Sequence, residues 1–314
     1  MLNKLTFVLI TLLITTTVLA DSYSTEEKNI NFVITPSVAY RYDVFKYAIA
    51  DNMFTNKKIS ELIWKNRIIQ PSIKFEIEPK PNQFIFLGQV RYGYILKNPS
   101  KSWDLDWDHD YQRSELGSKS LSSVRGSILD LSGAVGYSVN LFNNNLLTFY
   151  LGYDYTDYRN KNYGYSQLVY KRESLPLTQL FQKYYFKTQA PWIGLSLNTP
   201  LNEKFTIIPI IKFYSFKHIG KGYWLFRGDL KQNPSLRNIA KGIGLGFDVD
   251  FVCKYSDNLD LKLNLETKRF KMKKGKQQMF YNADAFSGER VATIKLLDLS
   301  YMSSSISAGF KYKL

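Results

Sequence analysis

Hydrophobic residues occupy every second position along many stretches of this chain. Between Leu129 and Leu141 the odd-numbered residues are leucine, valine, tyrosine or glycine, whereas the even-numbered ones are small or polar. Residues 243–251 and 259–266 alternate in the same way, with glycine, aspartate, lysine, asparagine or glutamate between the apolar positions. Period-two alternation is typical of β-strands that have one apolar and one polar face. The pattern therefore predicts an all-β protein.

The alternating segments are longer than the strands of soluble proteins. They run for about ten to twenty residues, whereas globular strands typically have about 5–6. Charged residues on the polar face suit a water-filled lumen, and outer-membrane barrels alternate lipid-facing with lumen-facing residues. A soluble sandwich or barrel remains the alternative. The predicted strands lie near residues 30–48, 58–77, 83–97, 124–142, 146–159, 181–198, 204–217, 236–254, 258–272 and 290–314.

The connections between these segments alternate in length. Short joints fall at residues 78–82, 143–145, 199–204 and 256–258, and long polar ones at 98–123, 160–180, 218–235 and 273–289. Outer-membrane barrels place short turns on the periplasmic side and long loops outside, and they have an even number of strands. We therefore predict a ten-stranded antiparallel transmembrane β-barrel with both ends in the periplasm.

The first twenty residues have a different character from the rest. Lys4 precedes an apolar run from Leu5 to Val18, and the small residues of signal-peptidase sites follow at Val18-Leu19-Ala20. We predict a signal peptide over residues 1–20 and one barrel domain over residues 21–314. An uncleaved anchor is the alternative, although the run is shorter than the about 20 apolar residues that a spanning helix needs.

The C-terminal residues 306–314 alternate between apolar and polar up to the last position. This segment resembles the signal that the barrel-assembly machinery reads, so we expect that machinery as a partner. Leu314 departs from the signal, which usually ends in an aromatic residue. Export and barrel together predict the outer membrane of a Gram-negative-type bacterium.

The composition fits strands that are apolar at every second position better than it fits membrane helices. Hydrophobic residues make up 45% of the chain and aromatic ones 16%, yet the mean hydropathy is −0.25. A chain that is apolar at every second position gives such an average. Cys253 is the single cysteine, which excludes an intrachain disulfide.

Four segments resemble signatures of the omptins, the ten-stranded outer-membrane endopeptidases that use aspartate and histidine. Their order and spacing resemble the family more specifically than any one of them does. Ile63 departs from the pattern, because the family usually has an aspartate there. The segments are Ser-Glu-Leu-Ile-Trp-Lys at 60–65, Trp-Asp-Leu-Asp-Trp at 103–107, Pro-Trp-Ile-Gly-Leu at 191–195 and Ser-Ala-Gly-Phe-Lys-Tyr at 307–312.

The resemblance implies a catalytic site at the extracellular mouth. In omptins an Asp-Asp pair faces an Asp-x-His dyad across a cleft, and a water between them attacks the peptide. By resemblance, Asp104 and Asp106 form the pair, and their spacing directs both carboxylates to one face of a strand. Close carboxylates and an imidazole can hold a proton and activate water.

The opposite wall departs from the omptin pattern. Aligning the family's Tyr-x-Arg stretch on residues 225–227 puts Gly222 and Trp224 at the dyad positions. Using the nearby His218 instead puts Phe216 where the aspartate is expected. Neither register recovers the dyad, so we expect that the ordinary omptin mechanism is missing.

Two further residues remain candidates if the chain is an active protease. His109 lies beside the acidic pair and, like His218, is a possible partner of it. Asp43, on the first predicted strand, stands near the place of the glutamate that binds a basic substrate side chain in omptins. A plain lumen charge is an equal alternative, because one residue of register decides between lumen and lipid.

Residues 103–110 form the most acidic segment of a basic chain. A calcium loop is one interpretation, because clustered oxygen ligands suit that ion. The glycine and terminal glutamate of an EF-hand loop are missing. A solvated loop with interfacial tryptophans is the other alternative to an acidic wall of omptin type.

The net charge of +15 points to anionic partners. Lys271, Lys273 and Lys274 belong to a basic run at the end of the ninth predicted strand, and we expect contact with lipid A phosphates, with lipopolysaccharide as a structural lipid. Omptins bind that lipid. A solvated loop is the alternative, and export argues against nucleic acid. We expect no cofactor and no metal site.

These observations lead to three hypotheses about function. The first is an omptin-like surface protein that lacks an intact protease site and acts by binding a host or peptide ligand through extracellular loops, as an adhesin or receptor does. The second is an active endopeptidase that uses Asp104, Asp106 and a relocated histidine. The third is a small channel.

Overall fold

The computed structural model describes residues 32–50, 56–77, 81–107, 116–141, 145–169, 175–283 and 290–314. The signal peptide expected at 1–20 and His109 lie outside these ranges. No helix in the described ranges is long and apolar enough to cross a membrane. The strands in these ranges are β1 (Phe32–Ala50), β2 (Lys58–Ile77), β3 (Gln83–Ile95), β4 (Lys101–Trp107), β5 (Leu116–Asn140), β6 (Leu146–Val169), β7 (Leu175–Pro200), β8 (Phe205–Trp224), β9 (Leu236–Lys254), β10 (Leu259–Tyr281) and β11 (Arg290–Lys313).

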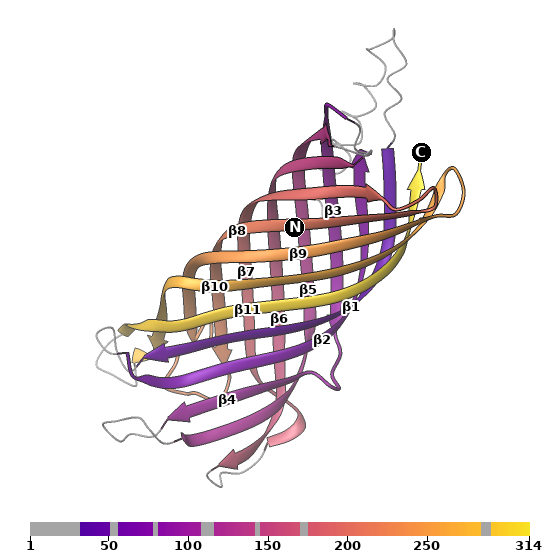
Figure 1. Cartoon of the computed structure of the whole chain (residues 1–314). Coiled ribbons are helices and arrows are strands. Elements are labelled where there is room, and N and C mark those ends of the chain that lie inside the picture. The colour runs from indigo at the N-terminus through magenta and orange to yellow at the C-terminus, as the bar shows by residue number, and fades with distance from the viewer. Residues whose placement is uncertain are drawn as a thin grey trace. The chain divides into compact units, whose positions relative to one another are not determined.

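The sheet closes on itself, because β1 is hydrogen-bonded to both β2 and β11 (Figure 1). Strands β3 and β4 share one position in the ring between β2 and β5. Ile95 at the end of β3 lies opposite Ile68 of β2, and Lys101 at the start of β4 lies opposite Lys65 of the same strand. The eleven described strands therefore make a ring of ten positions with antiparallel neighbours, as the alternation predicted.

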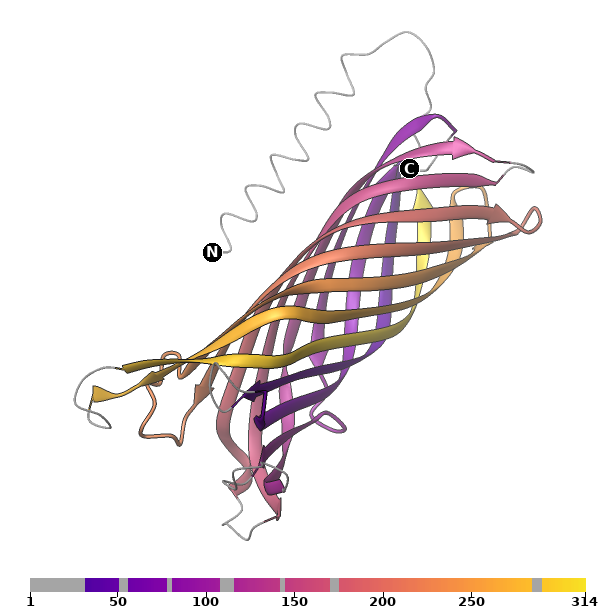
Figure 2. The ribbon, with the colours of Figure 1, turned by 60° about the vertical axis from the view of Figure 1, so that its left-hand side comes forward.

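The strands extend further than the sequence pattern indicated (Figure 2). The stretches 98–123 and 160–180 were expected as loops, but β4 lies inside the first, and β6 and β7 run far into the second. Pairing continues there with polar or mixed side chains on both faces, for example Lys161 opposite Lys183. The backbone hydrogen bonds of a ladder do not require an apolar face, so a pattern search misses these extensions.

The outer face of the ring carries a belt of exposed large hydrophobic side chains. Leu151 is 68% exposed and Phe84 66% exposed. The belt ends where basic residues replace apolar ones at outward positions, at Arg67 after Ile69 on β2 and at Lys217 after Phe213 on β8. We take the strand parts within this belt as the membrane-spanning segments, and the parts beyond Arg67 and Lys217 as the extracellular end.

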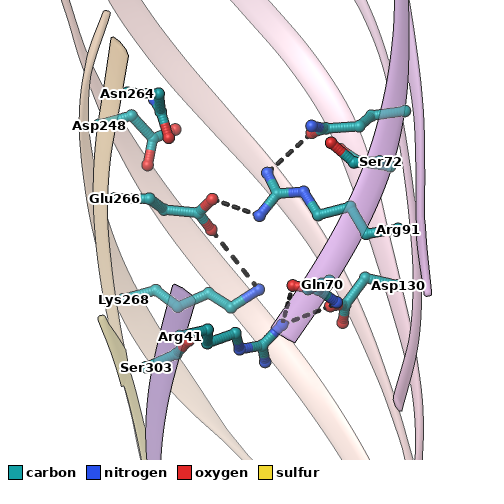
Figure 3. A network of polar contacts seen from close by, with 12 residues as sticks. Arg41, Gln70, Ser72, Arg91, Asp130, Asp248, Asn264, Glu266, Lys268 and Ser303 are labelled. Atoms are coloured by element: carbon teal, nitrogen blue, oxygen red, sulfur yellow. Dashed lines mark hydrogen bonds and ion pairs between the residues drawn. The ribbon is translucent and has the colours of Figure 1, made fainter. Parts of the chain in front are cut away.

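Inside the belt, charged side chains cross the lumen (Figure 3). Arg41 is 1% exposed, and it donates from Nε to Asp43 at 2.8 Å and from Nη1 to Asp130 at 2.5 Å. Arg91 of β3 pairs with Glu266 of β10 across the lumen. Charges that are buried inside a barrel need such partners, because an unpaired one is costly.

Candidate functional site

The acidic pair lies on β4, beyond the outward belt. Asp104 is opposite Leu62 of β2, and Asp106 is opposite Ser60. The Ser118 hydroxyl of β5 donates to Asp106 Oδ2 at 3.4 Å. Asp104 Oδ1 is buried and has no hydrogen-bond partner among the described residues. The strand therefore holds one carboxylate with a weak partner and one with an unused oxygen.

The two carboxyl groups favour the protonated state. Burial, with the neighbouring Asp106 charge, raises the pKa of Asp104 well above its usual value. Burial also raises the pKa of Asp106, although hydroxyls of Ser60 and Ser118 oppose that shift. Arg227 lowers both pKa values by a smaller amount. Two close carboxyls in a poorly hydrated place can share a proton in this way.

Arg227 stands on the segment that follows β8 and faces the acidic pair. Its Nε and Nη2 donate to the two carboxylate oxygens of Asp229 at 2.7 and 2.5 Å. The segment is tied to the end of β10, because the Lys231 amide donates to the Phe280 carbonyl at 2.8 Å. The hydrogen bonds to Asp229 raise the pKa of Arg227. A cation is thus held opposite the acidic wall.

Aromatic rings form the floor beneath the acidic pair. The Tyr47 ring lies 5.4 Å from that of Tyr184 and 5.9 Å from that of Trp64, measured between centroids. Burial raises the pKa of Tyr47, with Tyr184 and Asp104 adding to the shift. Asn238 Nδ2 donates to the Tyr184 hydroxyl at 2.9 Å. The pair therefore sits above a dry floor that water does not readily reach.

His218 belongs to this aromatic floor and not to its rim. It is 2% exposed, and its ring centroid lies 5.4 Å from that of Phe45 and 4.9 Å from that of Phe186. Its ring nitrogens lie 3.4 Å from the Tyr184 hydroxyl and 3.3 Å from the Thr188 hydroxyl. Burial lowers the pKa of His218 to about 3. The imidazole is therefore neutral at pH 7, with no carboxylate among its hydrogen-bond partners in the described residues.

A comparison of the sequence with known protein families identifies the family of this chain. Residues 36–314 match the family described as Pom, Protochlamydia outer membrane protein. The chain belongs to the Pom family. No curated protein matches it.

The fold of this Pom-family chain has counterparts among solved structures. The outer membrane protease OmpT from Escherichia coli is similar over 93% of this chain and 99% of its own, with a TM-score of 0.74 and 13% sequence identity. The translocator domain of the autotransporter NalP from Neisseria meningitidis covers 92% of this chain and 90% of its own, with a TM-score of 0.40 and 8% identity. The family match and the likeness to OmpT make the chain an outer-membrane β-barrel protein, and at 13% identity the likeness to OmpT is one of fold alone.

The two positions aligned with the omptin dyad lie on the outer end of β8. A Cβ atom added to Gly222 would lie 1.9 Å from the Trp224 ring and 2.8 Å from Leu236. Gly220 is enclosed in the same way, since an added Cβ would lie 2.0 Å from the Tyr184 hydroxyl. The space that a carboxylate would need on this wall of the Pom-family chain is filled by aromatic and aliphatic side chains.

The remaining sequence candidates lie apart from the mouth. Asp43 is 1% exposed, is paired with Arg41, and accepts a hydrogen bond from the Tyr301 hydroxyl at 2.9 Å, so it belongs to the membrane-level lumen. Lys271, Lys273 and Lys274 are exposed on β10. Among the described residues no group of three or more His, Cys, Asp or Glu side chains is placed to hold a metal ion.

The aromatic floor was missed from the sequence. Tyr47, Tyr184 and Asn238 are adjacent in space but come from β1, β7 and β9. Each occupies an inward position of its strand, so the parity of the alternation could have assigned all three to the lumen. The depth at which they meet depends on the register between strands, which the sequence does not show.

Proposed function

We propose that this Pom-family chain is a binding protein of the outer-membrane surface, adhesin- or receptor-like, that does not cleave peptides. One observation carries the proposal: His218, the only histidine among the described residues, is enclosed between Phe45 and Phe186 below the acidic pair. A general base must reach the proton that it abstracts directly or through one water. Tyr47, whose pKa is affected by the Asp104 charge, packs against Tyr184, and the Tyr184 hydroxyl lies 3.4 Å from a ring nitrogen of His218.

The wall opposite the acidic pair supports the same proposal. Trp224 and Leu236 occupy the space next to Gly222, and Arg227 is already neutralised by Asp229. An acid on one side and an arginine with an aromatic floor on the other offer hydrogen bonds and stacking surfaces. Such groups suit recognition of a ligand at the mouth, which can be of host or peptide origin.

A second candidate rests on the acidic pair itself. Asp104 and Asp106 are adjacent carboxyls whose pKa values burial raises, and Asp104 Oδ1 has no partner in the described structure. Two carboxyls that share one proton activate water in aspartic proteases. An active endopeptidase that uses this pair, with His109 or His218 as partner, is therefore the alternative, and Asp43 would contact substrate only after release from Arg41.

The channel hypothesis has less support. Arg91 and Glu266 meet across the lumen, and Arg41 binds Asp130 at the next level. The aromatic floor fills the lumen beyond them. We expect no conductance steps in planar bilayers, and steps larger than the detergent baseline would revive this hypothesis.

Lipid and the assembly machinery are the partners proposed for the barrel itself. Lys271, Lys273 and Lys274 are exposed beyond the last apolar outward residues of β10, where lipopolysaccharide phosphates would lie. We propose that they contact lipid A, and that residues 306–314 are read by the barrel-assembly machinery. Loss of lipopolysaccharide-dependent thermal stabilisation in a Lys271→Gln/Lys273→Gln/Lys274→Gln variant would support the lipid contact.

The deciding experiment is peptide cleavage by the protein refolded in lipopolysaccharide. A fluorogenic library with dibasic sites is the substrate, and Asp104→Ala/Asp106→Ala is compared with the wild type. We expect no cleavage by either, with both barrels shifted in mobility on heating. Cleavage that disappears in the double variant would refute the proposal and make the pair catalytic.

The same preparations separate a bound ligand from a cleaved one. Library peptides that remain with the wild type but not with the Asp104→Ala/Asp106→Ala variant would assign binding to the mouth. An Asp257→Ala variant is the matched control, because that side chain is 95% exposed at a turn between β9 and β10. Retention that is equal in all three proteins would place any ligand elsewhere on the surface.

A further inference from the structure

Strands β5 to β9 carry a basic surface on the outer side of the barrel, beyond the apolar belt. Its members share an outward position and a place on the extracellular part of their strands. We call this surface the basic wall. It consists of Arg125, Arg159, Lys161, Lys183, Lys221 and Arg237, with Tyr163, Tyr185 and Tyr223 between them.

Cations of the basic wall lie directly opposite one another across the ladders. Arg125 is paired in register with Lys161, and Lys161 with Lys183. In the neighbouring row, Lys221 is paired with Arg237. Like charges at directly opposite positions destabilise a sheet by themselves. Such an arrangement is stabilised when an anion from outside lies across the rows.

The protein supplies few anions of its own here. Asp157 lies 3.5 Å from Arg159 and 4.0 Å from Lys187. The other five cations of the basic wall form no ion pair with a described residue. The wall therefore has spare positive charge.

Tyrosines are interleaved with these cations. The Tyr185 and Tyr223 ring centroids are 5.4 Å apart, and the Arg125 guanidinium lies 5.2 Å from the centroid of the Tyr163 ring. Tyr185 is paired in register with both Arg159 and Lys221. Tyrosine offers an apolar face for stacking together with a hydroxyl that can donate or accept. Rings set between cations suit a ligand that has apolar C–H faces as well as acidic groups.

The height of the basic wall argues against lipid headgroups as the partner. Lys183 lies ten positions beyond Ile193 on β7, and Lys221 lies eight beyond Phe213 on β8, where both apolar residues are more than half exposed. Strands that rise about 3.3 Å per residue and tilt by about 35–45° place these lysines roughly 20–25 Å above Ile193 and Phe213. The headgroup layer adds only about 5–8 Å on each side.

We propose that the basic wall binds an acidic polysaccharide that stands outside the membrane. Carboxylate or sulfate groups would pair with the rows of lysine and arginine, and sugar rings would stack on the tyrosines. The inference rests on the binding role proposed above, and it names the class of partner. It uses the outer side of β5–β9 and leaves the acidic mouth free, so the two can fail separately.

Heparin is the probe, with the full chain refolded in zwitterionic micelles. The test variant is Lys183→Gln/Lys221→Gln/Arg237→Gln. The matched control is Lys217→Gln/Lys241→Gln/Arg269→Gln, which removes three exposed cations just above the belt on β8, β9 and β10. We expect the test variant to lose at least tenfold in affinity for heparin, with a weaker dependence on salt because fewer counterions are exchanged. The control should stay within about twofold of wild type.

Four further measurements separate charge from folding, from lipid binding and from the mouth. Lys183→Arg/Lys221→Arg should bind heparin like wild type, which separates charge from folding, and uncharged dextran should not bind. Equal loss in the test and control variants would overturn the proposal, since net charge alone would then explain binding. A test variant that keeps heparin affinity and loses only stabilisation by phosphatidylglycerol would make the partner a lipid. Heparin binding that survives Asp104→Ala/Asp106→Ala confirms that the mouth is not involved.

Discussion

The lumen is filled in two different ways along the length of the barrel. At the level of the outward belt it contains ion pairs, among them Arg91 with Glu266 and Lys212 with Asp248. At the extracellular end it contains stacked rings, among them Phe45 against Phe186 at 4.6 Å between centroids. The same strands build both parts, except that β4 takes the place of β3 at the extracellular end. The lumen therefore changes from a charged interior to an aromatic core largely along continuous strands.

The faces of a single strand exchange their polarity between the two levels. On β8, Phe213 faces out and Lys212 faces in within the belt, whereas Lys217 faces out and Phe216 faces in beyond it. The period of two continues throughout. Within the belt the outward residues face lipid and are apolar. At the extracellular end the outward residues face water and are polar, as on a sheet with one solvated face.

The difference shows what stabilises each level. Ring stacking and burial stabilise the extracellular end of the barrel as they would a soluble domain. At the level of the belt, stability depends on paired charges whose desolvation cost is offset by their contacts. Removing one large ring from the core and removing one charge from a pair should therefore have different costs. The substitutions below measure these costs.

The largest effect is expected from Phe45→Ala. Phe45 is 1% exposed and contacts the rings of Trp64, Tyr184 and Phe186. Truncating such a ring costs about 3–5 kcal/mol of the free energy of unfolding, measured by urea titration in micelles. Phe213→Ala is the control on the outward face and should cost much less. Equal losses would mean that the extension has no core of its own.

A smaller loss is expected from Asp130→Ala in the charged level. Arg41 would lose one partner but keep Asp43, so the cost should be about 2–3 kcal/mol, as for a hydrogen bond to a buried charge. The measurement is the same urea titration. Asp257→Ala removes an exposed partner of Lys254 and should leave stability unchanged within error. A loss for Asp130→Ala no larger than for Asp257→Ala would show that water already compensates Arg41.

The fold could be predicted from the sequence further than the site could. The alternation in 129–141 and 243–251 is confirmed in β5 and β9, and the ring has the ten positions expected. Strand ends were wrong, because the outward residues of the extensions are polar and the apolar period fades. The change from an apolar outward residue at Phe213 to a basic one at Lys217 could have been recognised in the sequence, because the period of two continues between them.

The site depends on information that no single segment carries. Asp104 and Asp106 were recognisable as a pair from their spacing, and the structure places both on one short strand. The position of His218 beneath them follows from ring contacts with β1 and β7, which depend on register and shear. A tryptophan beside Gly222 is visible in the sequence, but its occupation of the wall is a matter of packing.

The smallest effect is expected from Asp104→Asn, which tests how dry the top of the aromatic core is. Because burial raises the pKa of Asp104 in the folded state, the folded protein binds more protons than the unfolded one between the ordinary aspartate pKa and the raised value. Wild-type stability then falls as pH rises through that interval. Asp104→Asn removes the fall, so its unfolding midpoint should exceed that of wild type at pH 8 and match it near pH 4.

Asp229→Asn should behave oppositely, because Arg227 lowers the pKa of Asp229 and its contribution is lost as pH falls. A lower midpoint for Asp104→Asn at pH 8 would instead mean that Arg227 stabilises an ionised Asp104, and the mouth would then be a hydrated ion-pair site and not the roof of a dry core.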